Sequence, residues 1–147
     1  MQEELKSFVS YATAFEVGYA KNDWSVVDAL LTDDIVWSVH GTKSKVGGAF
    51  EGRADVIEAI RYSTDTYDRR FQKREPHSES QLVIPHGVYF PFTVTYTSEG
   101  LPPFVLHGEE WDLFRDGKLS MHYEILHNAD DLEAFIAEHE AKLEPRI

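Results

Sequence analysis

Acidic residues and a histidine alternate with apolar residues on the two sides of a predicted hairpin turn near the C-terminal end of the chain. Arg115-Asp116-Gly117 predicts a three-residue loop, a type I turn with Gly117 as a G1 bulge. In that register Glu110 lies opposite His122, whereas a two-residue loop would pair His122 with Trp111. Side chains of a strand alternate between the two faces of a sheet. One face then carries Glu110, Asp112, Ser120, His122, Glu124 and Leu126. The other face carries Trp111, Leu113, Leu119, Met121, Tyr123 and Ile125.

The polar face has the groups that proton transfer requires. A carboxyl group buried beside a second carboxyl and an imidazole shares protons, so we expect at least one acid with a raised pKa. A histidine beside a carboxylate takes and returns a proton near neutral pH. Glu110 and His122 are therefore candidate proton-transfer partners, with Glu124 or Asp112 orienting the ring. Such a pair suits enolisation, intramolecular aldol closure or dehydration, none of which needs a cofactor.

Which face is buried is left open by the residues alone. The polar face is either solvated, with the Trp111 side packed on the helices, or it lines an interior with the apolar side outward. His122-x-Glu124 and Glu110 also offer three potential metal ligands. No recognised metal motif completes the set, and we expect no metal.

The rest of the chain predicts an α+β domain with its helices packed on one face of a curved sheet. Helical periodicity covers residues 3–21, 24–31 and 53–62, with a strand at 35–40 and a glycine-bearing loop at 41–52. Extended segments follow at 69–84 (one or two strands), 88–98, 104–115 and 118–126. Asn128 has the chemistry to cap a last helix.

Composition excludes several classes of function. The 147 residues form a single domain, and 26 acidic against 14 basic residues give a formal net charge of -12. This charge disfavours nucleic acid and anionic membrane as partners. Without cysteine there is no thiolate zinc site and no thiol nucleophile. The acidic start and the lack of a long apolar stretch predict a cytoplasmic protein.

The order and spacing of several motifs resemble the nuclear transport factor 2-like superfamily, with SnoaL-like polyketide cyclases and ketosteroid isomerase-like proteins most similar. The motifs are Asn22-Asp23-Trp24, Leu30 to Trp37, Gly52-Arg53, Asp112 to Leu119 and His122-Tyr123-Glu124. This resemblance spans the chain to about Leu126 and implies a single SnoaL-like domain over residues 1–147. It implies a cone-shaped antiparallel sheet wrapped around the long first helix, with an apolar pocket at the open end and an extra C-terminal helix. It also favours the polar face as the inside.

The resemblance argues against steroid isomerase activity. Ketosteroid isomerases use a tyrosine on the first helix, an aspartate base on the early strand and a protonated acid on a late strand. The matching positions here hold Phe15, Val39 and Glu110, so only the last fits. Tyr11, Tyr19 and His40 would substitute only after a register shift. Epoxide hydrolysis is a lesser option, because no Asp-Arg-Asp arrangement is evident.

Two functions follow from the resemblance. The first is a small cofactor-independent cyclase, isomerase or dehydratase acting on a small hydrophobic carbonyl or polyketide-like compound. The alternative is a non-catalytic binding or association domain. His77 resembles a catalytic histidine of scytalone-dehydratase-like members in placement, but a surface or strand-end histidine is the favoured interpretation. Relatives often dimerise through the back of the sheet, so a homodimer is expected, and the last helix is a candidate lid. The expected ligand-binding residues are Tyr11, Phe15, Tyr19, Trp37, Val39 and His77.

Overall fold

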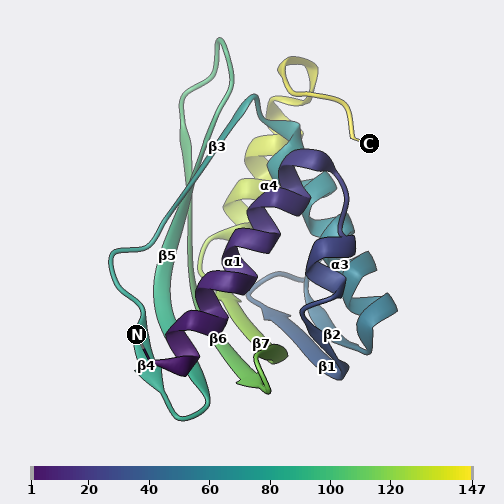
Figure 1. The fold of residues 1–147 in the computed structure, drawn as a ribbon. Coiled ribbons are helices and arrows are strands. Elements are labelled where there is room, and N and C mark those ends of the chain that lie inside the picture. The colour runs from purple at the N-terminus through teal and green to yellow at the C-terminus, as the bar shows by residue number, and fades with distance from the viewer. Residues whose placement is uncertain (1, 147) are drawn as a thin grey trace.

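The computed structural model describes residues 2–146 as a long helix lying across one side of a bent sheet (Figure 1). The helices are α1 (Glu3–Lys21), α2 (Ser25–Asp28), α3 (Arg53–Thr66) and α4 (Ala129–Glu138), with short 3-10 turns η1 (Asp68–Arg70) and η2 (Glu140–Lys142). The strands are β1 (Leu31–His40), β2 (Gly48–Glu51), β3 (Lys73–His77), β4 (Leu82–Ile84), β5 (Gly87–Thr97), β6 (Phe104–Arg115) and β7 (Lys118–Leu126). None of the helices in this part of the chain has the length and apolar character needed to cross a membrane.

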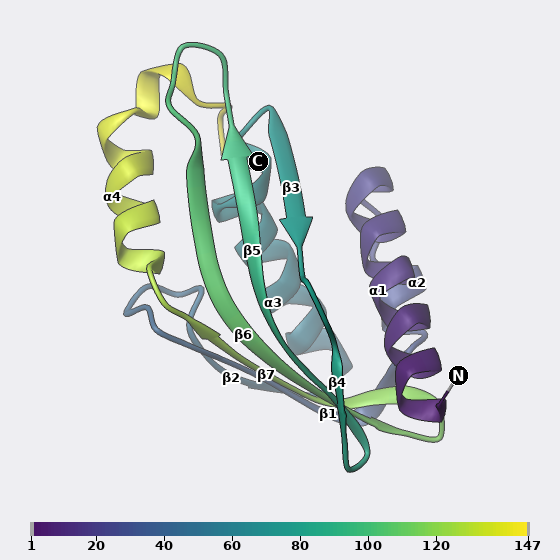
Figure 2. The same ribbon diagram turned by 90° about the vertical axis from the view of Figure 1, so that its left-hand side faces the viewer.

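The strands form one sheet in the order β2-β1-β7-β6-β5-β3, with β4 also pairing with β5. Figure 2 shows the strong bend of β5 and β6, with α1 on one side of them. The predicted α+β fold with a curved sheet and a long N-terminal helix is confirmed. The sheet is mixed rather than wholly antiparallel, because β1 and β7 pair in parallel. These two strands are far apart in the sequence, so no hairpin forces them to run in opposite directions.

Several predicted boundaries were wrong because tertiary pairing overrides local periodicity. The second helix covers only Ser25–Asp28, and Leu31 already pairs with Leu119 of β7. The predicted loop at 41–52 contains β2, which pairs with β1. Asn128 precedes α4, yet its side chain does not cap the helix. Its amide instead accepts a bond from the His107 N–H at 2.8 Å and donates to the Val105 carbonyl at 2.9 Å.

The β6–β7 hairpin closes with two residues rather than three. Arg115 pairs with Lys118, and Asp116 and Gly117 have φ values of 53° and 78°. Positive φ at both central positions is typical of a type I′ turn. The predicted type I turn with a G1 bulge was therefore wrong.

A bulge at Ser120 decides which way His122 points. Phe114 pairs with Leu119 and Leu113 with Met121, so Ser120 is the extra residue, and its hydroxyl donates to the Leu113 carbonyl at 3.1 Å. Strict alternation from Leu119 would have turned His122 outward, and the extra residue turns it inward. As a result His122 lies opposite Asp112, and Leu119 is buried rather than on the outer face. The predicted pairing of His122 with Glu110 was off by two residues, an even number that preserves the face.

Close packing of β5 fixes the backbone of β6 at the same point. A Cβ atom added to Gly87 would lie 1.9 Å from the carbonyl oxygen of Asp112. Any side chain at residue 87 would therefore displace the strand segment that carries Asp112.

We predict that Gly87→Ala lowers the free energy of unfolding by at least ~2 kcal/mol, because overpacking here must move backbone rather than a flexible side chain. Chemical denaturation measures the change. Gly100→Ala is the control: no atom lies within 4 Å of the added Cβ, and only the φ of +80° opposes it. This strain costs roughly 1 kcal/mol. Equal losses in the two variants would contradict the prediction.

Candidate active site

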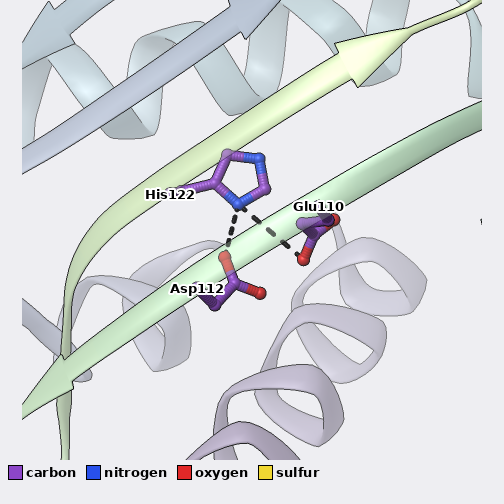
Figure 3. A group of neighbouring side chains, drawn as sticks. All are labelled: Glu110, Asp112 and His122. Carbon is purple, nitrogen blue, oxygen red and sulfur yellow. Dashed lines mark hydrogen bonds and ion pairs between the residues drawn. The ribbon is translucent and has the colours of Figure 1, made fainter. Parts of the chain in front are cut away.

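His122 is held between two carboxylates in the interior of the protein. Its Nδ1 atom lies 2.7 Å from Asp112 Oδ1, and its Nε2 atom lies 3.1 Å from Glu124 Oε1. Asp112 and His122 are 0% and 1% exposed. Figure 3 shows the side chains of Glu110 and Asp112, both from β6, pointing toward the ring that β7 carries. Both ring nitrogens therefore face acceptors, which favours the doubly protonated imidazolium.

The charges around His122 keep it protonated. Burial lowers the pKa of His122, but Asp112 and Glu124 outweigh it and raise the pKa to about 9. Trp37 adds to this effect, because its ring stacks on the imidazole at 3.6 Å between centroids and 16° between planes. An aromatic face attracts a cation placed over it. The contact arises because Trp37 of β1 is the direct neighbour of His122 in the parallel pairing.

Glu110 is a neutral acid in this environment. Its Oε2 atom lies 3.8 Å from His122 Nδ1, too far for a hydrogen bond. Burial raises the pKa of Glu110 well above its ordinary value, and the charge on Asp112 raises it further. Asp112 Oδ2 is buried and has no hydrogen-bond partner among the residues that the structure describes. A protonated Glu110 donating to Asp112 would satisfy this oxygen and stabilise the neutral acid.

Tyr11 is a second neutral donor beside the same carboxylates. Burial raises the pKa of its phenol well above the ordinary value, and Asp112, Glu110 and Glu124 raise it further. Tyr11 lines the cavity described below, and within residues 2–146 its hydroxyl has no hydrogen-bond partner. It is therefore free to donate to a bound molecule.

These groups face a cavity of about 300 Å³. Its volume lies at the lower end of the range for ligand pockets. Most of the predicted site residues line it, whereas Asp112 lies behind His122 and Tyr19 is absent from the wall. The predicted residues in the wall are Tyr11, Phe15, Trp37, Val39, His77, Glu110, His122 and Glu124. His77 is exposed and lies in the wall beside Ser78.

Tyr19 has a different setting from the one expected. Its ring lies between two guanidinium groups, 4.5 Å from Arg69 and 4.6 Å from Arg74. Arg69 also donates to the Tyr19 carbonyl at 3.0 Å. These contacts tie the end of α1 to the segment that follows α3.

The C-terminal helix does not cover the cavity. No residue of α4 belongs to the cavity wall, and Leu132 and Ile136 of this helix are buried in the core instead. The expectation that the helix acts as a lid was wrong. Its apolar face is used for packing, with Phe135 against Phe104 at 5.4 Å between ring centroids.

The sequence analysis missed a second polar group in the cavity wall: Glu16, Asp68, Arg74 and Tyr96. A signal was present for one of them. Glu16 follows Phe8 and Ala12 at steps of four, so it lies on the apolar stripe of α1. A charged residue on that stripe indicates a polar interior partner. The partner, Arg74 of β3, is identified only by the tertiary structure.

The deep cluster was tested as a metal site. Three potential ligand atoms, a carboxylate oxygen from Glu110, another from Asp112 and a ring nitrogen from His122, lie within 4.8 Å of one another. The separation of 2.7 Å between Nδ1 and Oδ1 is that of a hydrogen bond. Two ligands of a tetrahedral zinc ion at ~2.0 Å would lie about 3.3 Å apart. As arranged, the three side chains fit a shared proton better than a metal ion.

Solved structures of other proteins have the same fold. A putative isomerase from Rhodopseudomonas palustris matches with a TM-score of 0.72 at 19% identity, covering 89% of this chain and 96% of its own. A nuclear transport factor 2-like protein of unknown function from Burkholderia pseudomallei matches at 0.67 and 16%, covering 89% and 95%. A putative SnoaL-like polyketide cyclase from Shewanella putrefaciens matches at 0.67 and 10%, covering 92% and 88%.

The chain therefore has the nuclear transport factor 2-like fold, and the predicted resemblance is confirmed at the level of fold. No protein-family model matches the sequence, and no curated protein matches it either. A shared fold hosts many activities, so function has to be argued from the side chains of the site.

We predict that the stability of the protein falls as pH rises from about 6.5 to about 9. The native pKa of His122 is raised from its ordinary 6.5 to about 9, so the native state holds a proton that the unfolded chain has lost. The stabilisation by this proton is complete below pH 6.5, the pKa of the unfolded chain, and is lost as the pH rises through the native pKa of about 9. One such proton gives a slope of up to ~1.4 kcal/mol per pH unit. The raised pKa of Glu110 acts in the same direction.

Urea denaturation at a series of pH values checks this prediction. The double variant Asp112→Asn/His122→Gln removes both charges without leaving a lone buried carboxylate, and its slope should be shallower by the contribution of His122. His127→Gln, at a half-exposed ion pair with Glu109, should keep the wild-type slope. Parallel curves for the wild type and the double variant would contradict the assignment.

Proposed function

We propose that this chain is a cofactor-independent enzyme of the cyclase, isomerase or dehydratase type that moves protons beside the carbonyl group of a small hydrophobic compound. One observation carries the proposal. A buried imidazolium is held by Asp112 and Glu124 at the wall of an apolar cavity, next to a carboxyl group that burial keeps neutral. Burying these groups is costly, and acid–base chemistry is where such a cost is usual.

The roles differ from those expected from the sequence. Because His122 is already protonated, it is not the base; it holds Glu124 through Oε1, and Oε2 receives no bond from residues 2–146. Glu124 is then the base, and Glu110 and Tyr11 are the donors for the carbonyl oxygen. Asp112 touches no ligand and positions the imidazolium.

The proton movements balance as follows. Glu124 takes a proton from the carbon beside the carbonyl group, and the C–H electron pair forms the carbon–carbon double bond of an enol. Glu110 gives its proton to the carbonyl oxygen, and Tyr11 donates a hydrogen bond to the same oxygen. As the carbonyl group re-forms, the enol O–H proton returns to Glu110. Transfer of the proton on Glu124 to another carbon completes an isomerisation. Attack of the enol carbon on a second carbonyl group closes a ring, and the new alkoxide takes the proton from Glu124. Departure of a neighbouring hydroxyl group with the proton from Glu124 releases water and gives dehydration.

The comparisons support a role of this kind without fixing it. The similar structures include a putative isomerase and a putative SnoaL-like polyketide cyclase, and both are proteins of low identity to this chain. The alternative is a binding domain without chemistry. Such a domain has no need for a raised pKa at Glu110 or for two carboxylates around a buried histidine, so these features favour the enzyme.

The proposed chemistry predicts catalysis of hydrogen–deuterium exchange at the methyl group of para-hydroxyacetophenone in deuterated water, followed by NMR. Glu124→Gln and Glu110→Gln should each lower the exchange rate by about a hundredfold or more, the range for a general acid or base. Tyr11→Phe should give a smaller loss. Glu109→Gln is the control and should have no effect, because Glu109 accepts a hydrogen bond from Tyr89 and does not line the cavity. Exchange that is equal in all variants would contradict the proposal and favour the binding domain.

We also propose that two copies associate through the outer face of the sheet. A row of aromatic side chains crosses four adjacent strands there: Tyr89 to Trp111 at 4.9 Å, Trp111 to Tyr123 at 5.5 Å and Tyr123 to His40 at 4.7 Å. Two copies of such a row can face each other about a twofold axis, which suits a second copy of the chain. Partly exposed aromatic patches are typical of interfaces.

Analytical ultracentrifugation tests this association. The wild type should sediment as a dimer and Trp111→Lys as a monomer with an unchanged circular dichroism spectrum. Val9→Lys is the matched control, because Val9 is an exposed apolar residue on α1, away from this face. A monomeric wild type would overturn the proposed dimer.

A further inference from the structure

The cavity wall contains a second polar centre that the proposed chemistry does not use. Arg74 donates to Glu16 through both terminal nitrogens, at 2.8 and 3.2 Å, and through Nε to Asp68 Oδ1 at 3.2 Å. The buried Tyr96 donates to the same Asp68 oxygen at 2.5 Å. These residues come from α1, η1, β3 and β5, so four elements converge to build this centre.

Asp68 has an acceptor left over. Both of its protein donors bind Oδ1, and Oδ2 accepts no hydrogen bond from any residue between 2 and 146. Arg74 is already matched by the two oxygens of Glu16, so its charge does not require a second carboxylate. The side chain of Asp68 is 14% exposed in the cavity wall, so a ligand that displaces water from Oδ2 must supply a donor in its place. A ligand that donates a hydrogen bond would meet that need.

The charges of the site select against anions. In the part of the cavity wall that the structure describes, the carboxyl groups of Glu16, Asp68 and Glu124 stand against the cations Arg74 and His122. Glu16 is half-exposed, and burial raises the pKa of Asp68 while Arg74 opposes that rise. Like charges at close range in a poorly solvated cavity repel strongly. A ligand that carried a carboxylate or a phosphate would add to the excess of negative charge.

The two polar centres lie at different levels of α1. Tyr11 belongs to the deep centre and Glu16 to the second one, five residues later. At the rise of an α-helix this corresponds to about 7.5 Å along the axis. Phe15 lies between them in the wall, and Phe90 and Phe92 of β5 add aromatic surface. A flat ring between two polar ends fits this arrangement.

Resting on the proposed function, we infer that the substrate is an uncharged ring compound with its reacting carbonyl at Glu110 and a hydroxyl group at its far end that donates to Asp68 Oδ2. Asp68 thus determines specificity: it accepts hydroxylated compounds and rejects carboxylated ones.

Four acetophenones that differ only in the para substituent test this inference: hydroxyl, methyl, methoxy and carboxylate. Dissociation constants are measured by quenching of tryptophan fluorescence at about pH 6.5, where the phenol of the hydroxyl compound keeps its proton and the carboxylate compound is ionised. Wild type should bind the hydroxyl compound roughly tenfold more tightly than the methyl isostere, the value of one hydrogen bond to a charged group. The methoxy compound should resemble the methyl one, and the carboxylate should bind most weakly.

The variant Asp68→Asn replaces the hydrogen-bond acceptor at Oδ2 with a donor. The amide oxygen can keep the bonds from Arg74 and Tyr96, while an NH₂ group replaces Oδ2 and donates instead of accepting. The preference for hydroxyl over methyl should fall to less than about threefold, and the carboxylate should bind at least about tenfold more tightly than to wild type. Asp65→Asn is the matched control, because Asp65 pairs with Arg69 and does not line the cavity.

The outcomes separate this inference from the proposed function. Equal affinities of wild type for the hydroxyl and methyl compounds, or an unchanged order in Asp68→Asn, would overturn the role of Asp68. Deuterium exchange that still depends on Glu124 would leave the proposed chemistry in place. Conversely, a hydroxyl preference that depends on Asp68 without any exchange would support the ligand assignment and refute the enzyme.

Discussion

The buried ion pair between Asp112 and His122 is the interaction on which the rest of the site depends. Charges are removed from water here at a cost of several kcal/mol each, and only close pairing and further hydrogen bonds offset that cost. Three features of the fold serve this pair. The Ser120 bulge turns His122 inward, Gly87 lets β5 approach the Asp112 carbonyl, and Trp37 covers the ring. Loss of the bulge or of the close approach at Gly87 would disturb the pairing, and loss of Trp37 would uncover the imidazole ring.

The same pair sets the protonation of its neighbours. Burial raises the pKa values of the nearby Glu110 and Tyr11, and the Asp112 carboxylate raises them further, so both are favoured in their neutral forms. A site with one permanent imidazolium, one free carboxylate and two neutral donors can offer both a base and an acid at neutral pH. The division of labour comes from the environment, since Glu110 and Glu124 are chemically the same side chain.

Helix α1 connects this chemistry to ligand recognition. Its inner face carries Tyr11 to the deep centre, Phe15 to the apolar middle and Glu16 to the second centre. The clasp of Tyr19 between Arg69 and Arg74 holds the end of the helix in place. The helical rise between Tyr11 and Glu16 sets the separation of the two polar centres, so a ligand that contacts both is selected by length.

The sequence by itself determined the fold, and most of the site residues that it predicted line the cavity. The apolar stripe of α1, the alternating strands and the motif order were sufficient for the α+β architecture and for the face that carries Glu110, Asp112, His122 and Glu124. These features depend on local periodicity, which short segments express without their partners. The predicted hairpin register was wrong by two residues, yet the face was right because the side-chain period is also two.

Only the tertiary structure decided the partners within that face. The Ser120 bulge, the stacking of Trp37 on His122 across a parallel pair and the bonds of Arg74 to Glu16 join residues that are distant in sequence or depend on one unpaired residue. Alternation patterns do not encode a bulge, and no local pattern indicates which distant strand becomes a parallel neighbour. For the same reason the sequence indicated Glu110 as the direct partner of His122, with Asp112 or Glu124 orienting the ring. In the structure Asp112 and Glu124 both bond the ring, and Glu110 lies 3.8 Å from Nδ1.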